Sequence, residues 1–585
     1  MTDTTTDPAT DTATDPAPAA PEPDGHFGGA GLDLPSLNLM IEALEDFVDA
    51  ALSPELQLQL DHEDRCPEDI VRAMSDPMTL GVQLVFIPEQ YGGMDGNAFD
   101  SYRVCEVMAR KDIGLATAVF ATFLGSDPIV VGATEEQKQE WLGAIAEQGV
   151  VFAYGATEPD AGSDLGAMTT TATPVTDDDG TVTAYRLNGR KQWISNGSIA
   201  DFSTILAATP EGPTWFVVAR DTPGFTSGTP EDKHGLRLSN TASLFLDDVE
   251  VPAGNLVGTR GGLGLVQAQQ VFGYTRLMVA AFGLGGGWEA LDRAIAYSTQ
   301  REQGGGPLSE KQGFTHKLIV PHAVRLEAAR AYMEDTADRL DRGLGDNGAM
   351  NTEGAIAKYV ATEAGNAAAD AAIQAHGGYG YTRPYVVEKI RRDVRITTIY
   401  EGTSEIMEMT IARGRWQEHL KSSGRHYVDM GTEMASLHAR NPLVGADAAS
   451  LAARSLAVVL DCCRVGRLTR NQHVLFRIGE LVAATETAVV FAHAADKAMA
   501  GRRFQKSPTR FTGDALAAMS RVFARESAHK VALDGSRWVA GALEPDSPVL
   551  AGLDGIPADA ICNAQGGLVA DMDRVADVLY GRTPA

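Results

Sequence analysis

One carboxylate stands out in this sequence because of the residues on either side of it. Glu401 lies between an aromatic residue and a glycine, in the stretch Ile-Tyr-Glu-Gly-Thr-Ser-Glu-Ile of residues 399–406. The glycine and threonine are typical of a helix start, which is also the simplest non-catalytic explanation of the motif. A carboxylate in a water-poor turn is a stronger base than in solution, because desolvation raises its pKa. Glu401 is therefore a candidate general base.

A second stretch, Tyr-Gly-Ala-Thr-Glu-Pro-Asp-Ala-Gly-Ser-Asp at residues 154–164, combines hydroxyls with small side chains. Thr157, Gly162 and Ser163 bring hydroxyl and backbone N–H groups into a tight loop. Such a loop suits a phosphate or a polar planar ligand. A plain turn between a strand and a loop is the alternative reading.

A third stretch, Asn-Gly-Arg-Lys-Gln-Trp-Ile-Ser-Asn-Gly at residues 188–197, reads as a strand and a turn. If the side chains alternate regularly, Trp193 and Ser195 share one face of this strand. A tryptophan offers a flat apolar wall and a serine one hydrogen bond, a pairing that suits a ring system. A tryptophan packed in the β core is an equally good explanation.

Length and composition limit the class of protein. A chain of 585 residues should form about three or four domains. Its apolar runs fall short of the roughly 20 residues that span a bilayer, and the N-terminus does not resemble a secretory signal, which favours the cytoplasm. The Thr/Pro/Ala-rich acidic residues 1–31 are expected to be disordered. The five cysteines show no ligand spacing, so no metal site is predicted.

The charge is distributed unevenly along the chain. The net charge is −29, but residues 416–585 carry 19 basic and 18 acidic side chains, so the acidic excess lies in the first 415 residues. An acidic body argues against nucleic acid as a main partner. Residues 464–510 hold nine Lys and Arg against three acids, which leaves open a peripheral membrane contact or a protein contact.

The periodicity of apolar residues divides the chain into regions. Residues 32–150 show helical spacing, and residues 151–255 alternate apolar and polar positions between turn signals. Residues 256–415 return to Ala-rich amphipathic helices, and residues 416–585 form a further helical region. The predicted fold is mostly α with a central antiparallel β domain.

Taken together, these motifs resemble the acyl-CoA dehydrogenase family of FAD flavoproteins. The resemblance covers roughly residues 40–415 in continuous order. It implies an α/β/α three-domain fold with an added C-terminal helical domain. Further matching segments lie at residues 88–93, 235–241, 248–252, 272–276, 301–312 and 374–378.

The resemblance also implies roles for individual residues. FAD would contact a set in its own subunit: Tyr154, Ala156, Thr157, Gly162, Ser163, Trp193, Ile194, Ser195, Thr403 and Glu405. A neighbouring subunit would grip the same FAD through Arg301, Gln312, Gln374, Gly377 and Gly378. The acyl-CoA would face Ser163, Thr275, Arg276 and Gly402. Sharing of the cofactor implies at least a dimer, and a dimer is favoured over a tetramer.

The implied reaction is the α,β-dehydrogenation of an acyl-CoA to trans-2-enoyl-CoA, a step of fatty acid β-oxidation. Glu401 would remove the α proton, and electrons would pass from FAD to electron-transfer flavoprotein. Some family members carry the base at the position of Thr275, which here has no proton-accepting charge. Of the other acids nearby, Glu388, Glu405 and Glu408 are predicted to be exposed, and Asp393 to pair with arginines.

The sequence also departs from the family pattern. Gly304, Gly305 and Gly306 follow Arg301 where many relatives have Phe-Gly, which removes a ring expected near the adenosine of FAD. Gly273 stands where some relatives have an aspartate, and Asp160 replaces a common glycine. These changes leave Glu401 in place but weaken the prediction for the CoA contacts.

Residues 416–585 resemble the extra helical domain of very-long-chain acyl-CoA dehydrogenases, where it supports a dimer and a membrane-facing surface. A module that covers a surface buried in tetrameric relatives is the favoured alternative. The acyl chain length stays open, because Phe120 favours a short or medium chain and the tail a long one. Three rival functions remain: an acyl-CoA oxidase using O₂, a DNA-associated alkylation-response flavoprotein, and a scaffold without catalysis.

Overall fold

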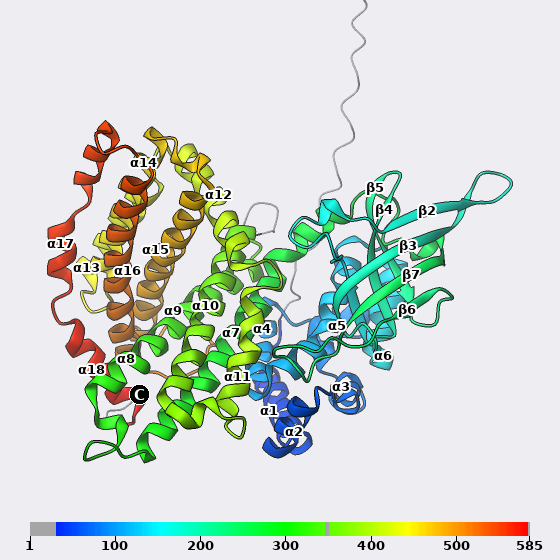
Figure 1. Ribbon diagram of the computed structural model, residues 1–585, viewed down its shortest axis with the longest axis horizontal. Coiled ribbons are helices and arrows are strands. Elements are labelled where there is room, and N and C mark those ends of the chain that lie inside the picture. The colour runs from blue at the N-terminus through cyan, green and yellow to red at the C-terminus, as the bar shows by residue number, and fades with distance from the viewer. Residues whose placement is uncertain (1–30, 345–349, 583–585) are drawn as a thin grey trace, which may run out of the picture.

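The computed structural model of the protein describes residues 31–344 and 350–582. Residues 1–30 of the segment predicted to be disordered therefore lie outside the described residues. The described chain forms a helical bundle with a β domain on one side and further C-terminal helices on the other (Figure 1). The fold class predicted from the sequence is confirmed.

The N-terminal region is helical, as predicted. Side chains cap several of its helices: Asp33 Oδ1 accepts from Ser36 N at 2.7 Å, and Asn97 and Asp100 form a reciprocal capping box. The helices are α1 (Leu34–Ala51), α2 (Pro54–Glu63), α3 (Glu68–Ser75), α4 (Ala98–Lys111), α5 (Ile113–Gly132) and α6 (Glu135–Gln148). Among the described helices, α5 alone is long and apolar enough to cross a membrane, but 89% of its apolar window is buried. It is a core helix of this fold.

The β domain is a curled seven-stranded sheet. Its strands are β1 (Phe152–Gly155), β2 (Thr171–Thr176), β3 (Val182–Ser195), β4 (Phe202–Thr209), β5 (Gly212–Ala219), β6 (Phe225–Ser227) and β7 (Thr241–Pro252). The order is β1-β4-β2-β3-β7-β6, with β5 paired to β4. Pairing is mainly antiparallel, as predicted, but β1 and β4 run parallel. The strands with two buried faces, β4 and β5, are rich in apolar residues.

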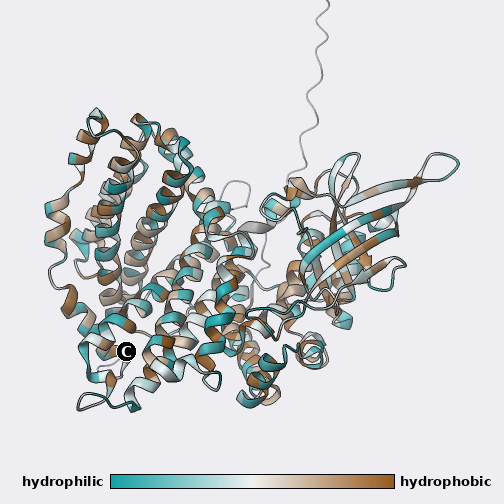
Figure 2. Ribbon diagram, in the orientation of Figure 1, coloured by the Kyte–Doolittle hydropathy of each residue, from teal (hydrophilic) through white to brown (hydrophobic). Residues whose placement is uncertain are grey.

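The bundle is built around two long helices that pack very closely. Its helices are α7 (Gly264–Gln300), α8 (Gln312–Leu318), α9 (Val320–Asp341), α10 (Asn351–His376), α11 (Val386–Val394) and α12 (Ser404–Lys421). A β carbon added at Gly365 would lie 2.1 Å from the Gly283 carbonyl oxygen, so the α7–α10 contact requires glycine. Brown and teal residues alternate along the helices in Figure 2, as expected for amphipathic helices packed on one another.

The C-terminal module continues from α12 on the side of the bundle away from the sheet (Figure 1). Its helices are α13 (His426–Arg440), α14 (Ala446–Val465), α15 (Gln472–Met499), α16 (Gly513–Gly541), α17 (Ala558–Ala564) and α18 (Leu568–Leu579). Buried ion pairs attach it to the rest of the chain: Arg415 Nε lies 2.6 Å from Glu486 Oε1, and Lys506 Nζ lies 2.6 Å from Asp100 Oδ1. One apolar core joins the module to the bundle.

Two predictions about acidic residues near Glu401 are wrong. Glu408 is buried between α12 and α15, where Arg477 Nη2 lies 3.2 Å from its Oε2. Asp393 pairs with Lys389 rather than with an arginine, at 2.5 Å between Oδ2 and Nζ. The partner of Glu408 lies on another helix, whereas Lys389 lies one turn before Asp393 on α11 (Val386–Val394). Glu405 is exposed, as predicted, and Glu388 is partly exposed.

Candidate active site

The structure places the motif of residues 154–164 beside the motif of residues 188–197. The backbone N–H of Gln192 donates to the Thr157 carbonyl oxygen at 3.0 Å. Lys191 Nζ donates to the Ala156 carbonyl oxygen at 3.1 Å and to Glu158 Oε1 at 2.7 Å. The loop after β1 and the end of β3 thus form one surface.

A buried ion pair, Glu158 with Lys191, holds the loop in place. Glu158 also accepts hydrogen bonds from the backbone N–H groups of Thr169 at 2.6 Å and Thr170 at 3.0 Å. Burial alone would raise the pKa of Glu158, but the hydrogen bonds from Lys191 and these threonines bring it down to about 2, so the carboxylate stays ionised. Sequence analysis missed both residues, because the reason for their pairing is visible only in the folded loop.

Trp193 sits in a β-bulge. Between Lys191 and Ile194 the register with β7 shifts by one residue, and Trp193 has a φ of 59°. The regular alternation expected for Trp193 and Ser195 therefore does not hold. The Trp193 side chain is 57% exposed, so it is not a core residue. An exposed, backbone-fixed indole beside a hydroxyl-rich loop is suited to stack on a planar ligand.

The remaining predicted residues of this surface are accessible to different degrees. Tyr154 lies on β1 with its ring 4.9 Å from that of Trp215. Ala156 and Ile194 have buried side chains and can offer only their backbone groups to a ligand, whereas Gly162 and Ser163 are exposed. Thr157 and Ser195 are half-buried. The surface thus offers backbone groups, hydroxyls and one flat ring.

Glu401 lies in a left-handed turn just before α12. Its φ is 54° and that of Gly402 is 92°, a conformation that costs a non-glycine residue on the order of 1 kcal/mol or more. Thr403 caps α12, its Oγ1 accepting from the backbone N–H of Ile406 at 3.3 Å. The turn therefore fixes the direction of the Glu401 side chain.

Two buried cations face this turn. Lys358, on α10, donates from Nζ to the Gly402 carbonyl oxygen at 2.6 Å, and Arg276 lies on α7 beside Thr275. Burial raises the pKa of Glu401, while Arg276, Lys358 and the Thr275 hydroxyl act in the opposite direction. Glu401 Oε2 is buried and has no hydrogen-bond partner in the described part of the chain. This carboxylate can accept a proton from a bound molecule.

The residues predicted to reach a neighbouring subunit lie elsewhere. Arg301 follows the C-terminal end of α7, 25 residues after Arg276, which is roughly 38 Å along a helix. Its guanidinium lies 5.7 Å from the centre of the Tyr379 ring, next to the exposed Gln374, Gly377 and Gly378. Gln312 Nε2 donates to Asp573 of α18 at 2.9 Å. One chain therefore does not bring this group together with Glu401.

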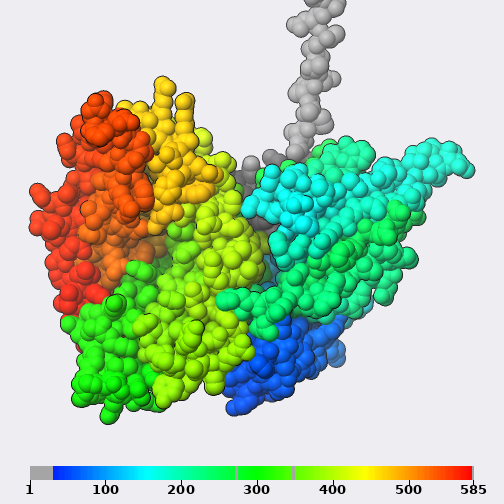
Figure 3. Space-filling model, viewed as in Figure 1, coloured from blue at the N-terminus to red at the C-terminus, as the bar shows by residue number. Residues whose placement is uncertain are grey.

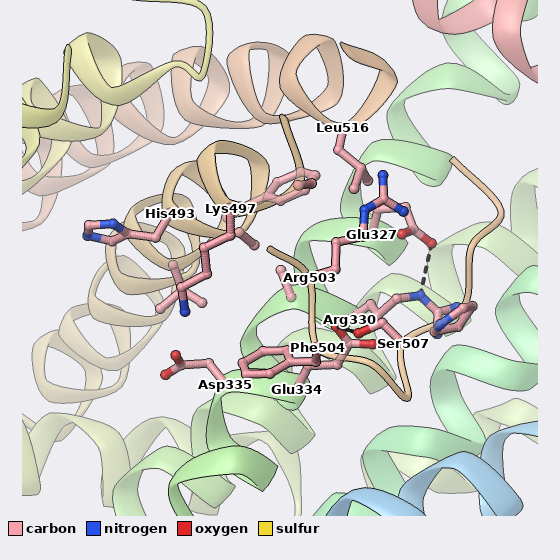
Figure 4. Close-up of a pocket in the computed structure, with 16 residues that line it drawn as sticks. Glu327, Arg330, Glu334, Asp335, His493, Lys497, Arg503, Phe504, Ser507 and Leu516 are labelled. Atoms are coloured by element: carbon pink, nitrogen blue, oxygen red, sulfur yellow. Dashed lines mark hydrogen bonds and ion pairs between the residues drawn. The ribbon is translucent and has the colours of Figure 1, made fainter. Parts of the chain in front are cut away.

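A pocket between α9 and the C-terminal module is a separate feature (Figure 4). Several of its polar groups are paired: Arg330 Nε lies 3.1 Å from Glu327 Oε1, and Ser507 Oγ donates to Glu334 at 2.8 Å. We regard it as part of the contact between module and bundle. In Figure 3 the cyan and green surface of the β domain adjoins the yellow-green part of the bundle.

Comparison with known proteins identifies the family. Models of the acyl-CoA dehydrogenase N-terminal, middle and C-terminal domains match residues 34–149, 153–249 and 262–415. The chain belongs to the acyl-CoA dehydrogenase family. An acyl-CoA dehydrogenase of Bacillus subtilis is 35% identical over 383 residues, which are 64% of this chain and 96% of the relative. The resemblance seen in the sequence is confirmed, and the protein is an oxidoreductase.

Two solved structures extend the comparison. Butyryl-CoA dehydrogenase from Megasphaera elsdenii is 34% identical, with a TM-score of 0.60, and covers 65% of this chain and 97% of its own. An acyl-CoA dehydrogenase from Bacillus anthracis, complexed with FAD, is 23% identical with a TM-score of 0.79. It covers 94% of this chain and 95% of its own, so its fold includes the C-terminal module. FAD is the cofactor expected of this family, and the exposed Trp193 with its hydroxyl-rich loop fits a flavin.

Lys358 gives a testable prediction for this acyl-CoA dehydrogenase family member. Its positive charge stabilises the carboxylate form of Glu401, so Lys358→Met should raise the pKa of Glu401 further. The acidic limb of the kcat/KM profile should then move to higher pH. At neutral pH the loss of a buried charged hydrogen bond should lower kcat/KM roughly tenfold or more. Lys358→Arg, which keeps the charge, should restore the position of the limb, and an unmoved limb in Lys358→Met would exclude this role.

Proposed function

We propose that the protein oxidises an acyl-CoA thioester to the trans-2-enoyl-CoA, with Glu401 as the catalytic base. The observation that carries the proposal is a buried carboxylate oxygen that has no hydrogen-bond partner among the described residues. It is held in a strained turn beside two buried cations. Among the acids predicted as competitors, Glu405 is exposed, and Glu388, Asp393 and Glu408 are all paired with basic side chains. Glu401 is the acid best placed for proton removal.

Each part of the site has a defined task in this reaction. Glu401 Oε2, a buried atom, accepts the proton that leaves the carbon α to the thioester. Arg276 and Lys358 limit the rise in the pKa of Glu401, so that enough of the group is ionised to act as a base. A hydrogen bond from the Glu401 backbone N–H to the thioester oxygen would stabilise the developing enolate.

The loop of residues 156–163, the Trp193 ring, Ser195 and Thr403 would hold FAD. When bound, FAD supplies the acceptor for the hydride that leaves the β carbon. The distance of roughly 38 Å between Arg276 and Arg301 along α7 favours a homodimer in which each subunit completes the other's cofactor site. We further propose electron-transfer flavoprotein as the acceptor and a cytoplasmic location. In such a dimer, the C-terminal module would cover the surface of α9, α10 and α12 that a tetramer would bury.

Anaerobic titration of the purified yellow protein with a panel of acyl-CoAs tests this function. At least one thioester should bleach the flavin absorbance, and the preferred one should be the best substrate in dye reduction with electron-transfer flavoprotein. Failure of every thioester to bleach a fully loaded protein would exclude the function. If the protein in air forms one peroxide for each acyl-CoA oxidised, and this reaction does not need electron-transfer flavoprotein, the protein is instead an acyl-CoA oxidase.

A further inference from the structure

A second buried carboxyl group lies close to Glu401, on a helix that the proposed mechanism does not use. Asp127, on α5, is fully buried. Neither of its carboxyl oxygens has a hydrogen-bond partner among the described residues. Buried polar groups in folded proteins are nearly always hydrogen-bonded, so this group calls for an explanation.

Helix α5 is fastened to the strands that form the candidate site. Asn196 Nδ2, just beyond β3, donates to the Ala118 carbonyl oxygen at 2.7 Å. Thr204 Oγ1 of β4 donates to the Gly125 carbonyl oxygen at 2.8 Å. A β carbon at Gly125 would meet the Phe152 β carbon at 2.8 Å, so α5 lies directly against β1 here. Asp127 lies two residues after Gly125 on the same helix.

Asp127 interacts electrostatically with residues in and beside the candidate site. Burial raises the pKa of Asp127 far above its usual value, and the Glu401 carboxylate raises it further. Asp127 in turn contributes to raising the pKa of Tyr154 on β1 and of Tyr274, which precedes Thr275. Asp127 therefore lies within electrostatic range of both the catalytic turn and the residues expected to meet the ligand.

In its protonated form, which burial favours, the carboxyl group of Asp127 can both donate and accept a hydrogen bond. An unsatisfied polar group in this position is costly relative to a satisfied one. An apolar residue would avoid that cost. The cost is offset if a bound molecule supplies the missing partner.

The surroundings favour the acyl chain as the source of this partner. Glu401 acts on the acyl chain, and Tyr274 adjoins the predicted substrate residues Thr275 and Arg276. Phe120 lies seven residues before Asp127, on the same face of α5. Its ring packs 5.3 Å from that of Phe86 and 6.3 Å from that of Phe282. This face of α5 is thus apolar at one end and carries a hydrogen-bonding group at the other.

We propose that Asp127 recognises a polar substituent, a hydroxyl or carbonyl group, on the acyl chain of the substrate. The protein would then select a functionalised acyl-CoA over a plain saturated one of equal length. This inference rests on the proposed function, because it assumes that an acyl-CoA occupies the site beside Glu401.

The test compares hexanoyl-CoA with the positional isomers of hydroxyhexanoyl-CoA and oxohexanoyl-CoA that are substituted beyond the β carbon. The wild-type protein should show, for at least one isomer, a kcat/KM about tenfold or more above that for hexanoyl-CoA. Asp127→Leu should bring this ratio to about one, and Asp127→Asn, which still donates and accepts, should keep part of it. Ser126→Ala is the matched control, since Ser126 Oγ bonds only within the helix, to the Phe123 carbonyl oxygen at 2.8 Å. It should keep the full ratio.

Three results would overturn the inference. A wild-type protein that prefers hexanoyl-CoA over every isomer has no such recognition. An unchanged ratio in Asp127→Leu would exclude Asp127 as its source. Loss of FAD from Asp127→Leu, read as absorbance per subunit, would assign the partner of Asp127 to the cofactor. If hexanoyl-CoA and all isomers fail to bleach the loaded wild-type flavin, the proposed function itself fails.

Discussion

Glu401→Gln should yield a yellow protein whose turnover of acyl-CoA is lower by about 10² or more. The amide has nearly the same shape as the carboxylate, so the turn, its left-handed backbone and the Lys358 hydrogen bond to Gly402 should persist. What is lost is the capacity to accept a proton. Stopped-flow bleaching of the flavin by the preferred thioester measures this step directly.

The flavin content and melting temperature of this variant should match those of the wild type. Glu418→Gln, a change at a partly exposed acid of α12 that pairs with Lys421, provides the matched control and should leave turnover unchanged. Wild-type bleaching rates in Glu401→Gln would show that another group removes the proton.

Lys389→Met should lower the free energy of unfolding by about 3–5 kcal/mol. Lys389 Nζ lies 2.6 Å from Asp112 Oδ2 and 2.5 Å from Asp393 Oδ2, and all three side chains are buried. Removing the cation leaves two uncompensated carboxylates in the core. Because Asp393 Oδ1 also accepts from the Leu236 backbone N–H at 2.7 Å, the loss should loosen the contact between the β domain and the bundle.

Thermal and denaturant melts of the FAD-loaded protein would measure this change. Lys421→Met removes an exposed lysine from a surface pair, and should cost less than about 1 kcal/mol. Equal melting temperatures for the two variants would show that the buried triad contributes little to stability.

Much of the fold could be predicted because its signals are local. Alternating residues and turn signals between residues 151 and 255 predicted the β domain that runs from Phe152 to Pro252. The end of α13 also has a local cause, because the helix stops at Arg440, just before Pro442. The stretch around Glu401 predicted a turn followed by a helix, and the structure has both.

Features that depend on distant partners could not be predicted. The bulge at Trp193 arises from the pairing of β3 with β7, about 50 residues away, so regular alternation was the wrong expectation. Glu408 was expected on an exposed face, because nothing in its own helix shows that Arg477 of α15 will cover it. Lys358 and Asp127 were missed for the same reason. Each is an ordinary residue in its helix and gains significance from Gly402 or Glu401 across the bundle.

Helix α12 begins at the catalytic turn and ends inside the C-terminal module. Its Glu408 forms an ion pair with Arg477 of α15. A β carbon at Gly479 would lie 2.1 Å from the Glu408 carbonyl oxygen, so α15 packs directly against α12 here. Removing the C-terminal module would therefore expose the surface of α12 that Arg477 and Gly479 cover, on the helix that directly follows the turn of Glu401. Such a shortened version would need a redesigned outer surface on α12 before its chemistry could be compared fairly with the parent.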